Sequence, residues 1–266
     1  MKTISYLCIW FCLATAVAQP GTQPSFRSFD GTRIHYQTQG RGRAVVLLHG
    51  FIVHGKMWEK SALVPALVQA GCQVITLDLR GNGLSDKPHS PKSYENNAEV
   101  RDVMALVKHL KIKRYDVVGY SRGAILAARL LTMDKHVRSA VLGGMGADFT
   151  NPDWPRRQMF QEAFQGKAHL HPETNGAIAY AKSSGADTVA LGLLQQFQPV
   201  TTVAELSKIK TPVLVISGDQ DTENGKAGDL AKLLLNATLK SVPGNHNNTA
   251  QSEGFAKEVV KFLAEH

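Results

Sequence analysis

Short runs of continuously apolar residues recur along the chain and predict the strands of a buried sheet. They are residues 44–48, 72–77, 115–120, 137–144, 211–217 and 238–242. Runs that are apolar on both faces are typical of a parallel sheet covered by helices on both sides. A more polar stretch, residues 25–40, precedes them. The Asp30-Gly31 pair in its middle is a strong turn signal, which predicts an antiparallel hairpin at the start of the fold.

Helical periodicity lies between these runs. Five apolar residues recur at the spacing of one helix face: Val100, Val103, Met104, Val107 and Leu110. A similar pattern runs through residues 253–266. The alternation of strands and helices indicates an α/β fold with a mostly parallel central sheet flanked by helices.

One long segment interrupts this alternation. From about residue 149 to 206 no strand-like run occurs, and helical patches are separated by prolines. The segment predicts a small helical cap over one end of the sheet, inserted before the strand that begins near residue 211. Its acidic and basic residues nearly balance, so the cap gives no sign of a strongly anionic substrate.

Composition excludes some classes of protein. The chain has 266 residues, of which 43% are hydrophobic and 20% charged, the balance of an ordinary globular protein. The net charge is +8. No lysine- and arginine-rich run accompanies this charge, so no nucleic-acid partner is expected. A diffuse positive field could attract anionic ligands, but solubility alone is a sufficient reason for it.

The N-terminus has the form of a secretory signal peptide. A lysine, the apolar stretch from Ile4 and a small-x-small end predict cleavage after Ala18. The mature chain, residues 19–266, would then be one domain, secreted or periplasmic, with no lasting membrane anchor. An uncleaved anchor is the alternative, although the stretch is shorter than the roughly 20 residues of a membrane span. Cys72 alone remains in the mature chain, which therefore forms no internal disulfide.

Polar residues stand where predicted strands end, and ligand sites of α/β sheets gather at that edge. Ser121, Asp221 and His246 each follow a different apolar run, in the order serine, acid, histidine. Gly119, Ser121 and Gly123 form the pattern G-x-S-x-G, a strand-to-helix turn that exposes a nucleophilic serine. The alternative role for Ser121 is to cap the helix that follows it.

With its motifs in this order, the chain resembles the α/β-hydrolase fold superfamily, in the branch of compact capped serine esterases. The motifs are VVLLHGF, DLRGNGLSD, VVGYSRG, TPVLVISGDQD and VPGNH. The resemblance covers nearly the whole mature chain and is specific for the fold rather than for the substrate. It implies a hydrolase of small-molecule carboxylic esters or lactones that uses no cofactor and no metal.

The resemblance also implies a role for each candidate residue. Ser121 is the nucleophile and His246 the base that accepts its proton. Asp221, at the fourth position of G-x-x-D, orients the imidazole. The backbone N–H groups of Phe51 and Arg122 form the oxyanion hole.

The sequence leaves some assignments open. Asp219 and Asp148 are alternatives for the acid, and His49 is expected to hold its loop rather than to react. Arg122 stands where many relatives carry methionine or glutamine, and its cationic side chain is expected near the pocket, where it would favour acyl groups that are polar or carry a carboxylate.

Other functions on the same fold also remain. Carbon–carbon bond hydrolases and perhydrolase-type relatives share the triad. A slow or non-catalytic ligand-binding protein could keep the triad as well. A basic surface-binding protein is supported by the net charge alone.

Overall fold

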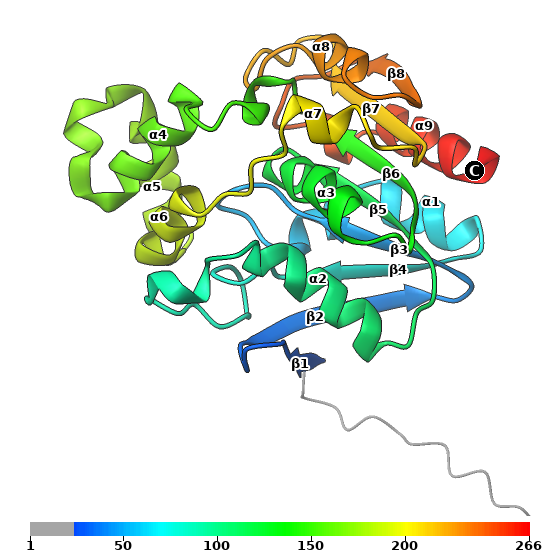
Figure 1. Ribbon diagram of the computed structural model, residues 1–266, viewed down its shortest axis with the longest axis horizontal. Helices are drawn as coiled ribbons and strands as arrows, with labels where there is room; N and C mark the ends of the chain where they lie inside the picture. Colours follow the sequence, from blue (N-terminus) through cyan, green and yellow to red (C-terminus); the bar gives the residue numbers. More distant parts are fainter. Residues whose placement is uncertain (1–23) are drawn as a thin grey trace, which may run out of the picture.

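The computed structural model describes residues 24–266, and its centre is a single sheet with helices on both faces (Figure 1). Within these residues the sheet has eight strands in the order β1-β2-β4-β3-β5-β6-β7-β8. The strands are β1 Ser25–Arg27, β2 Arg33–Gly40, β3 Arg43–Leu48, β4 Cys72–Leu77, β5 Tyr115–Tyr120, β6 Val137–Gly143, β7 Val213–Gly218 and β8 Ala237–Val242. β2 pairs antiparallel with β1 and β4, and the remaining pairs are parallel. The predicted α/β fold with its N-terminal hairpin is confirmed.

Alternation of side chains along the strands divides the core into two layers. On β3, Val46 and Leu48 pack in one layer, and Val45 and Leu47 pack in the other. The first layer is covered by α2 Ala98–His109, α3 Arg122–Met133 and α8 Ala227–Lys232. The second is covered by α1 Leu63–Gln69 and α9 Glu253–Glu265. All six residues of β5 are buried, because this strand is central and has a helical layer on each side.

The last strand, β8, differs from its prediction. Its run was expected to be buried on both faces, but most of its residues are exposed or partly exposed, and Leu239 is 51% exposed. β8 lies at the edge of the sheet, where β7 is its single strand neighbour. On this edge Lys240 forms an ion pair of 3.5 Å with Glu258 of α9. Charged residues of this kind discourage pairing with further strands.

The segment between β6 and β7 contains helices and no strand, as its sequence predicts. Its helices are α4 Pro155–Glu162, α5 Asn175–Ser183, α6 Thr188–Gln196 and α7 Val203–Leu206. Figure 1 shows α4, α5 and α6 to the left of the sheet, apart from the helices that cover its faces. Residues 149–206 are called the cap segment below. They have a small hydrophobic core of their own, in which Phe164 and Leu194 are buried and against which Phe51 packs from the loop after β3.

The predicted signal peptide lies outside the described residues. Among residues 24–266, no helix combines the length and the hydropathy needed to cross a membrane.

Candidate active site

Ser121 occupies a strained turn between β5 and α3. Its backbone has φ +55° and ψ −123°, a conformation that costs a non-glycine residue free energy. The turn is also tight. A Cβ on Gly119 would lie 2.2 Å from the Gly123 carbonyl oxygen, and a Cβ on Gly123 would lie 2.2 Å from the Leu48 carbonyl oxygen. Glycine is therefore required at both positions. Ser121 stands at the N-cap position of α3, but its hydroxyl accepts no capping hydrogen bond, so the alternative role as a cap is wrong.

The hydroxyl of Ser121 belongs to a chain of hydrogen bonds instead. It donates to His246 Nε2 at 2.9 Å, and His246 Nδ1 donates to Asp221 Oδ2 at 2.9 Å. The three residues follow β5, β7 and β8, so the parallel strands bring their side chains together at one edge of the sheet.

The surroundings of Asp221 favour its ionised form beside His246. Its side chain is 4% exposed and that of His246 is 11% exposed. Burial by itself raises the pKa of Asp221, but the hydrogen bond from His246 and the charge of that ring oppose it, and the net pKa lies below its ordinary value. The carboxylate can therefore fix the tautomer of the imidazole and stabilise an imidazolium.

Two further side chains hold His246, and no sequence motif indicated either of them. Tyr120, directly before the nucleophile, donates its hydroxyl to the backbone oxygen of His246 at 2.8 Å. Asn224 Nδ2 lies 3.4 Å from His246 Nε2 and donates to the Gly144 carbonyl oxygen at 3.1 Å. Tyr120 is the last residue of β5 and Asn224 lies in the loop after β7, so their positions in the sequence gave no sign of these contacts.

The alternative acids are placed elsewhere. Asp219 Oδ1 accepts the Gly244 N–H at 3.0 Å and so closes a turn. The carboxylate of Asp148 packs against the backbone of Gly225, where an added Cβ would lie 3.0 Å from it. Within the described residues neither carboxylate hydrogen-bonds to His246, so both alternatives are wrong.

Two backbone N–H groups near Ser121 have no acceptor among the described residues. Arg122 is the first residue of α3, and N–H groups of a first helical turn have no intrahelical partner. The Phe51 N–H is likewise free of a protein acceptor. Its loop passes beside the nucleophile, because a Cβ on Gly50 would lie 3.4 Å from Ser121 Cβ. The two predicted oxyanion donors thus lie in segments next to Ser121 and have no protein acceptor among the described residues.

His49 supports this loop and takes no part in the hydrogen bonds of Ser121. Its Nε2 accepts the Leu79 N–H at 3.0 Å, so Nδ1 carries the proton and donates to the Gly50 oxygen at 2.8 Å. The ring is completely buried, and burial lowers its pKa to about 4. His49 is therefore a neutral, structural histidine.

The expectation for the side chain of Arg122 is wrong. Its guanidinium is buried and hydrogen-bonds to both carboxylate oxygens of Glu99, at 2.6 and 2.5 Å, and to the Leu194 oxygen of α6 at 2.9 Å. Because Glu99 neutralises the charge, Arg122 cannot act as a free cation toward a substrate. Its backbone N–H remains at the site.

Two cavities reach Ser121, and Phe51, Arg156 and Phe160 line both of them. The smaller has a volume of about 60 Å³ and lies against the cap segment. The larger has a volume of about 590 Å³, and His246 lines it together with residues of α5. An ester bound at Ser121 can therefore place its acyl and alcohol parts in separate spaces.

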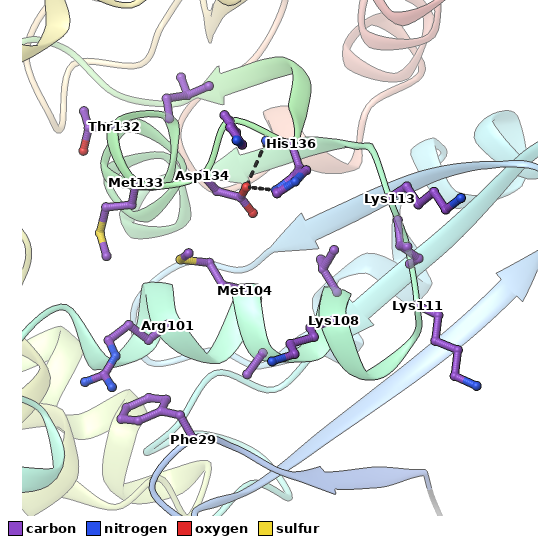
Figure 2. Close-up of a pocket in the computed structure, with 15 residues that line it drawn as sticks. Phe29, Arg101, Met104, Lys108, Lys111, Lys113, Thr132, Met133, Asp134 and His136 are labelled. Carbon is purple, nitrogen blue, oxygen red and sulfur yellow. Dashed lines mark hydrogen bonds and ion pairs between the residues drawn. The ribbon is translucent and has the colours of Figure 1, made fainter.

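A wider depression of about 1070 Å³ lies between α2 and the end of α3. Figure 2 shows basic side chains around it, among them Arg101, Lys108 and Lys111, together with the bonds between Asp134 and His136. It contains none of the residues that surround Ser121. The sequence did not indicate this gathering of charge, because it combines side chains of α2, of the loop after α2 and of the loop after α3.

Among residues 24–266, no three histidine, cysteine, aspartate or glutamate side chains gather as metal ligands. His171, which stands two residues after His169 in the sequence, hydrogen-bonds to Glu162 at 2.7 Å.

Comparisons with known proteins agree with this architecture. The family model described as alpha/beta hydrolase fold matches residues 43–159. The chain is 28% identical over 250 residues to a non-heme chloroperoxidase of Streptomyces lividans, covering 81% of this chain and 89% of that protein.

Two solved structures illustrate the likeness in fold. An esterase from Exiguobacterium antarcticum has a TM-score of 0.75 at 21% identity, over 91% of this chain and 100% of the esterase. The enol-lactonase from Burkholderia xenovorans LB400 has a TM-score of 0.73 at 23% identity, again over 91% and 100%. Such identities establish a common fold, and the chemistry has to be argued from the site.

Proposed function

Because the chain belongs to the α/β-hydrolase fold superfamily, we propose that it is a serine hydrolase of small or medium carboxylic esters, lactones included. The observation that carries this proposal is the unbroken path from Asp221 through His246 to Ser121, with both hydrogen bonds at 2.9 Å. A serine hydroxyl becomes a good nucleophile when a neighbouring base takes its proton. Here that base is oriented by a buried carboxylate.

The geometry supports a two-step acyl transfer. Ser121 Oγ attacks the ester carbonyl carbon while its proton passes to His246 Nε2, and Asp221 stabilises the imidazolium. The N–H groups of Phe51 and Arg122 donate to the oxyanion of the tetrahedral intermediate. Its collapse breaks the ester C–O bond, and His246 gives the proton to the leaving alcohol. Water then attacks the acyl-enzyme, with His246 again as base, and releases the acid.

The test uses 4-nitrophenyl acetate, butyrate and octanoate, together with a fluorophosphonate probe that labels activated serines. Ser121→Ala should lower kcat by at least about a thousandfold and abolish labelling. Ser183→Ala, which removes an exposed hydroxyl of α5 outside both cavities, should leave both unchanged. A folded protein with neither turnover nor labelling would refute the proposal. Labelling without turnover would instead support a ligand-binding protein on this fold.

A second activity is favoured by one comparison. The relative from Streptomyces lividans, which matches 81% of this chain, is named a non-heme chloroperoxidase. An acyl-enzyme on Ser121 that is cleaved by hydrogen peroxide instead of water releases a peracid. Adding hydrogen peroxide and an aryl sulfide to the ester assay measures this activity as sulfoxide, with Ser121→Ala as the blank.

We also propose that residues 1–18 direct the chain to export and are removed after Ala18. Their apolar stretch and small-x-small end support this. The full sequence is expressed in a host cell that secretes proteins, and the mass of the intact product is measured. The mass should be that of a mature chain that begins at Gln19. A chain that keeps Met1 in the membrane fraction would contradict it.

A further inference from the structure

The smaller cavity beside Ser121 has basic and amide groups in its lining and no acidic residue. Its volume is about 60 Å³. One water molecule needs roughly 10–15 Å³ on this measure, so the cavity has room for about four or five heavy atoms. Three arginines, Arg122, Arg156 and Arg157, contribute to its wall. Arg156 and Arg157 belong to the cap segment, so the near balance of charge along that segment does not describe the wall of this cavity.

Arg157 is the one of these three arginines without an acidic partner. Arg122 and Arg156 each form an ion pair with a glutamate. Arg157 donates from Nη2 to the Pro152 oxygen, and its buried Nε has no acceptor among the described residues. Burial lowers the pKa of Arg157, and the charge of Asp153, with which it forms no ion pair, opposes this shift only in part. A charge in this state favours the binding of an anion.

Two glutamines add to the polar part of the wall, to which Ser121 and Asn224 also belong. Gln195 of α6 and Gln198 just after it are 5% and 6% exposed, and both line the cavity. Neither side-chain amide hydrogen-bonds to another described residue, and neither is among the buried polar atoms that lack a partner, so their amide atoms keep some access to solvent. Their NH₂ groups are therefore free to donate to a ligand. Together with Arg157 they form a set of donors that matches a carboxylate.

The position of His246 decides which part of an ester enters this cavity. His246 lines the larger cavity and is absent from the lining of the smaller one. As the general acid it has to reach the leaving alcohol, so the alcohol belongs in the larger cavity. The smaller cavity then receives the acyl chain.

On the basis of the function proposed above, we infer that the smaller cavity is a subsite for a short acyl group that ends in a carboxylate, as in a half-ester of succinate. Arg157 is its counter-ion, and Gln195 and Gln198 are its hydrogen-bond donors. The acyl chain beyond the ester carbonyl of a succinate half-ester has five heavy atoms, which is the size that the cavity admits.

The test compares two esters of one shape that differ in charge. Monophenyl succinate carries a carboxylate where phenyl 4-methylpentanoate carries an isopropyl group, and both release phenol. The half-ester also hydrolyses without the enzyme, and the rate measured with Ser121→Ala is subtracted to correct for this background. The wild-type protein should favour the half-ester in kcat/KM. Arg157→Met should lower the ratio of the two kcat/KM values by about 10- to 150-fold, the range for a hydrogen bond to a charged group.

Two further variants separate the local contact from general electrostatics. Arg157→Lys, which keeps the charge, should restore part of the ratio. Lys182→Met removes a cation of α5 that lines neither cavity, and it should leave the ratio within about twofold, as exposed charges have weak effects. If Arg157→Met does not fold, Gln198→Leu tests the same subsite and should lower the ratio in the same direction.

The outcomes distinguish this inference from the function on which it rests. Suppose that the neutral ester is hydrolysed and that Arg157→Met leaves the ratio of the two kcat/KM values unchanged, or that the wild-type protein prefers the neutral ester. Either result would overturn the anionic subsite and leave the proposal of a serine hydrolase intact. Absence of hydrolysis of both esters, together with absence of fluorophosphonate labelling, would refute the proposed function itself.

Discussion

The buried ion pair between Arg122 and Glu99 leads to a quantitative prediction about stability. Both residues are 4% exposed, and each is the single acidic or basic partner of the other among the described residues. Replacing Glu99 by leucine leaves a guanidinium buried without a counter-ion, and replacing Arg122 by methionine leaves a buried carboxylate. Breaking a buried pair in this way costs about 3–5 kcal/mol in the free energy of unfolding.

The double variant should behave differently. With both charges removed, two apolar side chains of similar volume occupy the space, and such exchanges are often neutral. One loss remains, since Arg122 also donates to the Leu194 oxygen at 2.9 Å. That hydrogen bond accounts for about 1.5–3 kcal/mol. The double variant should therefore cost at least about 3 kcal/mol less than the sum of the single variants.

Urea unfolding at neutral pH, followed by circular dichroism, measures these free energies. Arg33→Met is the matched control, because its pair with Asp86 has the same chemistry at 3.2 Å but side chains that are 55% and 42% exposed. It should change the free energy of unfolding by less than about 1 kcal/mol. Two results would refute the reasoning. One is a Glu99→Leu variant with a free energy of unfolding no lower than that of Arg33→Met. The other is a double variant whose loss of stability equals the sum of the two single losses.

Three further changes test other parts of the structure. Gly123→Ala should destabilise the fold by on the order of 3 kcal/mol or more, because its Cβ would lie 2.2 Å from a β3 carbonyl oxygen, whereas Gly176→Ala meets nothing within 4 Å and should not destabilise; thermal melting compares the two. Burial lowers the pKa of His49 from 6.5 to about 4, so the folded state binds fewer protons than the unfolded chain between these values. The resulting stability is present above pH 6.5 and is lost as the pH falls to 4, by about 3 kcal/mol. His49→Asn should flatten this fall in urea titrations at several pH values, and an unchanged slope would contradict it. Tyr120→Phe removes the donor to the His246 oxygen, and it should lower kcat by about tenfold to a hundredfold with little change in KM. An unaltered kcat would show that this contact does not position the base.

Features with a local cause could be predicted from the sequence. The strand over residues 115–120 is a continuous apolar run, and the structure places β5 on the same residues. The strands then carry Ser121, Asp221 and His246 to a common edge, because parallel strands end on the same side of a sheet. Order along the chain, together with the resemblance to the α/β-hydrolase fold, was thus sufficient to predict that these three side chains meet.

Features that depend on distant partners could not be predicted in this way. Glu99 reads as an acidic residue in the first turn of a helix, and its pairing with Arg122 arises from the packing of α2 against α3. For that reason Arg122 was expected to be a free cation. Arg157 shows the reverse, because its charge was counted as balanced within its segment, and the structure leaves it without an acidic partner. Charge balance along a chain does not measure charge balance in space.

The sheet order also leads to an expectation about the order of events in folding. Ser121 lies in the part of the sheet that ends with β6, whereas Asp221 and His246 depend on β7 and β8, which add to the edge of that part. The bond between Ser121 and His246 spans 125 positions of the chain, and contacts of such separation form slowly. During refolding, helices and central strands should therefore form before Ser121 becomes reactive. The rate at which fluorophosphonate labelling returns would then measure how fast β7 and β8 join the sheet. Circular dichroism alone would not distinguish this step.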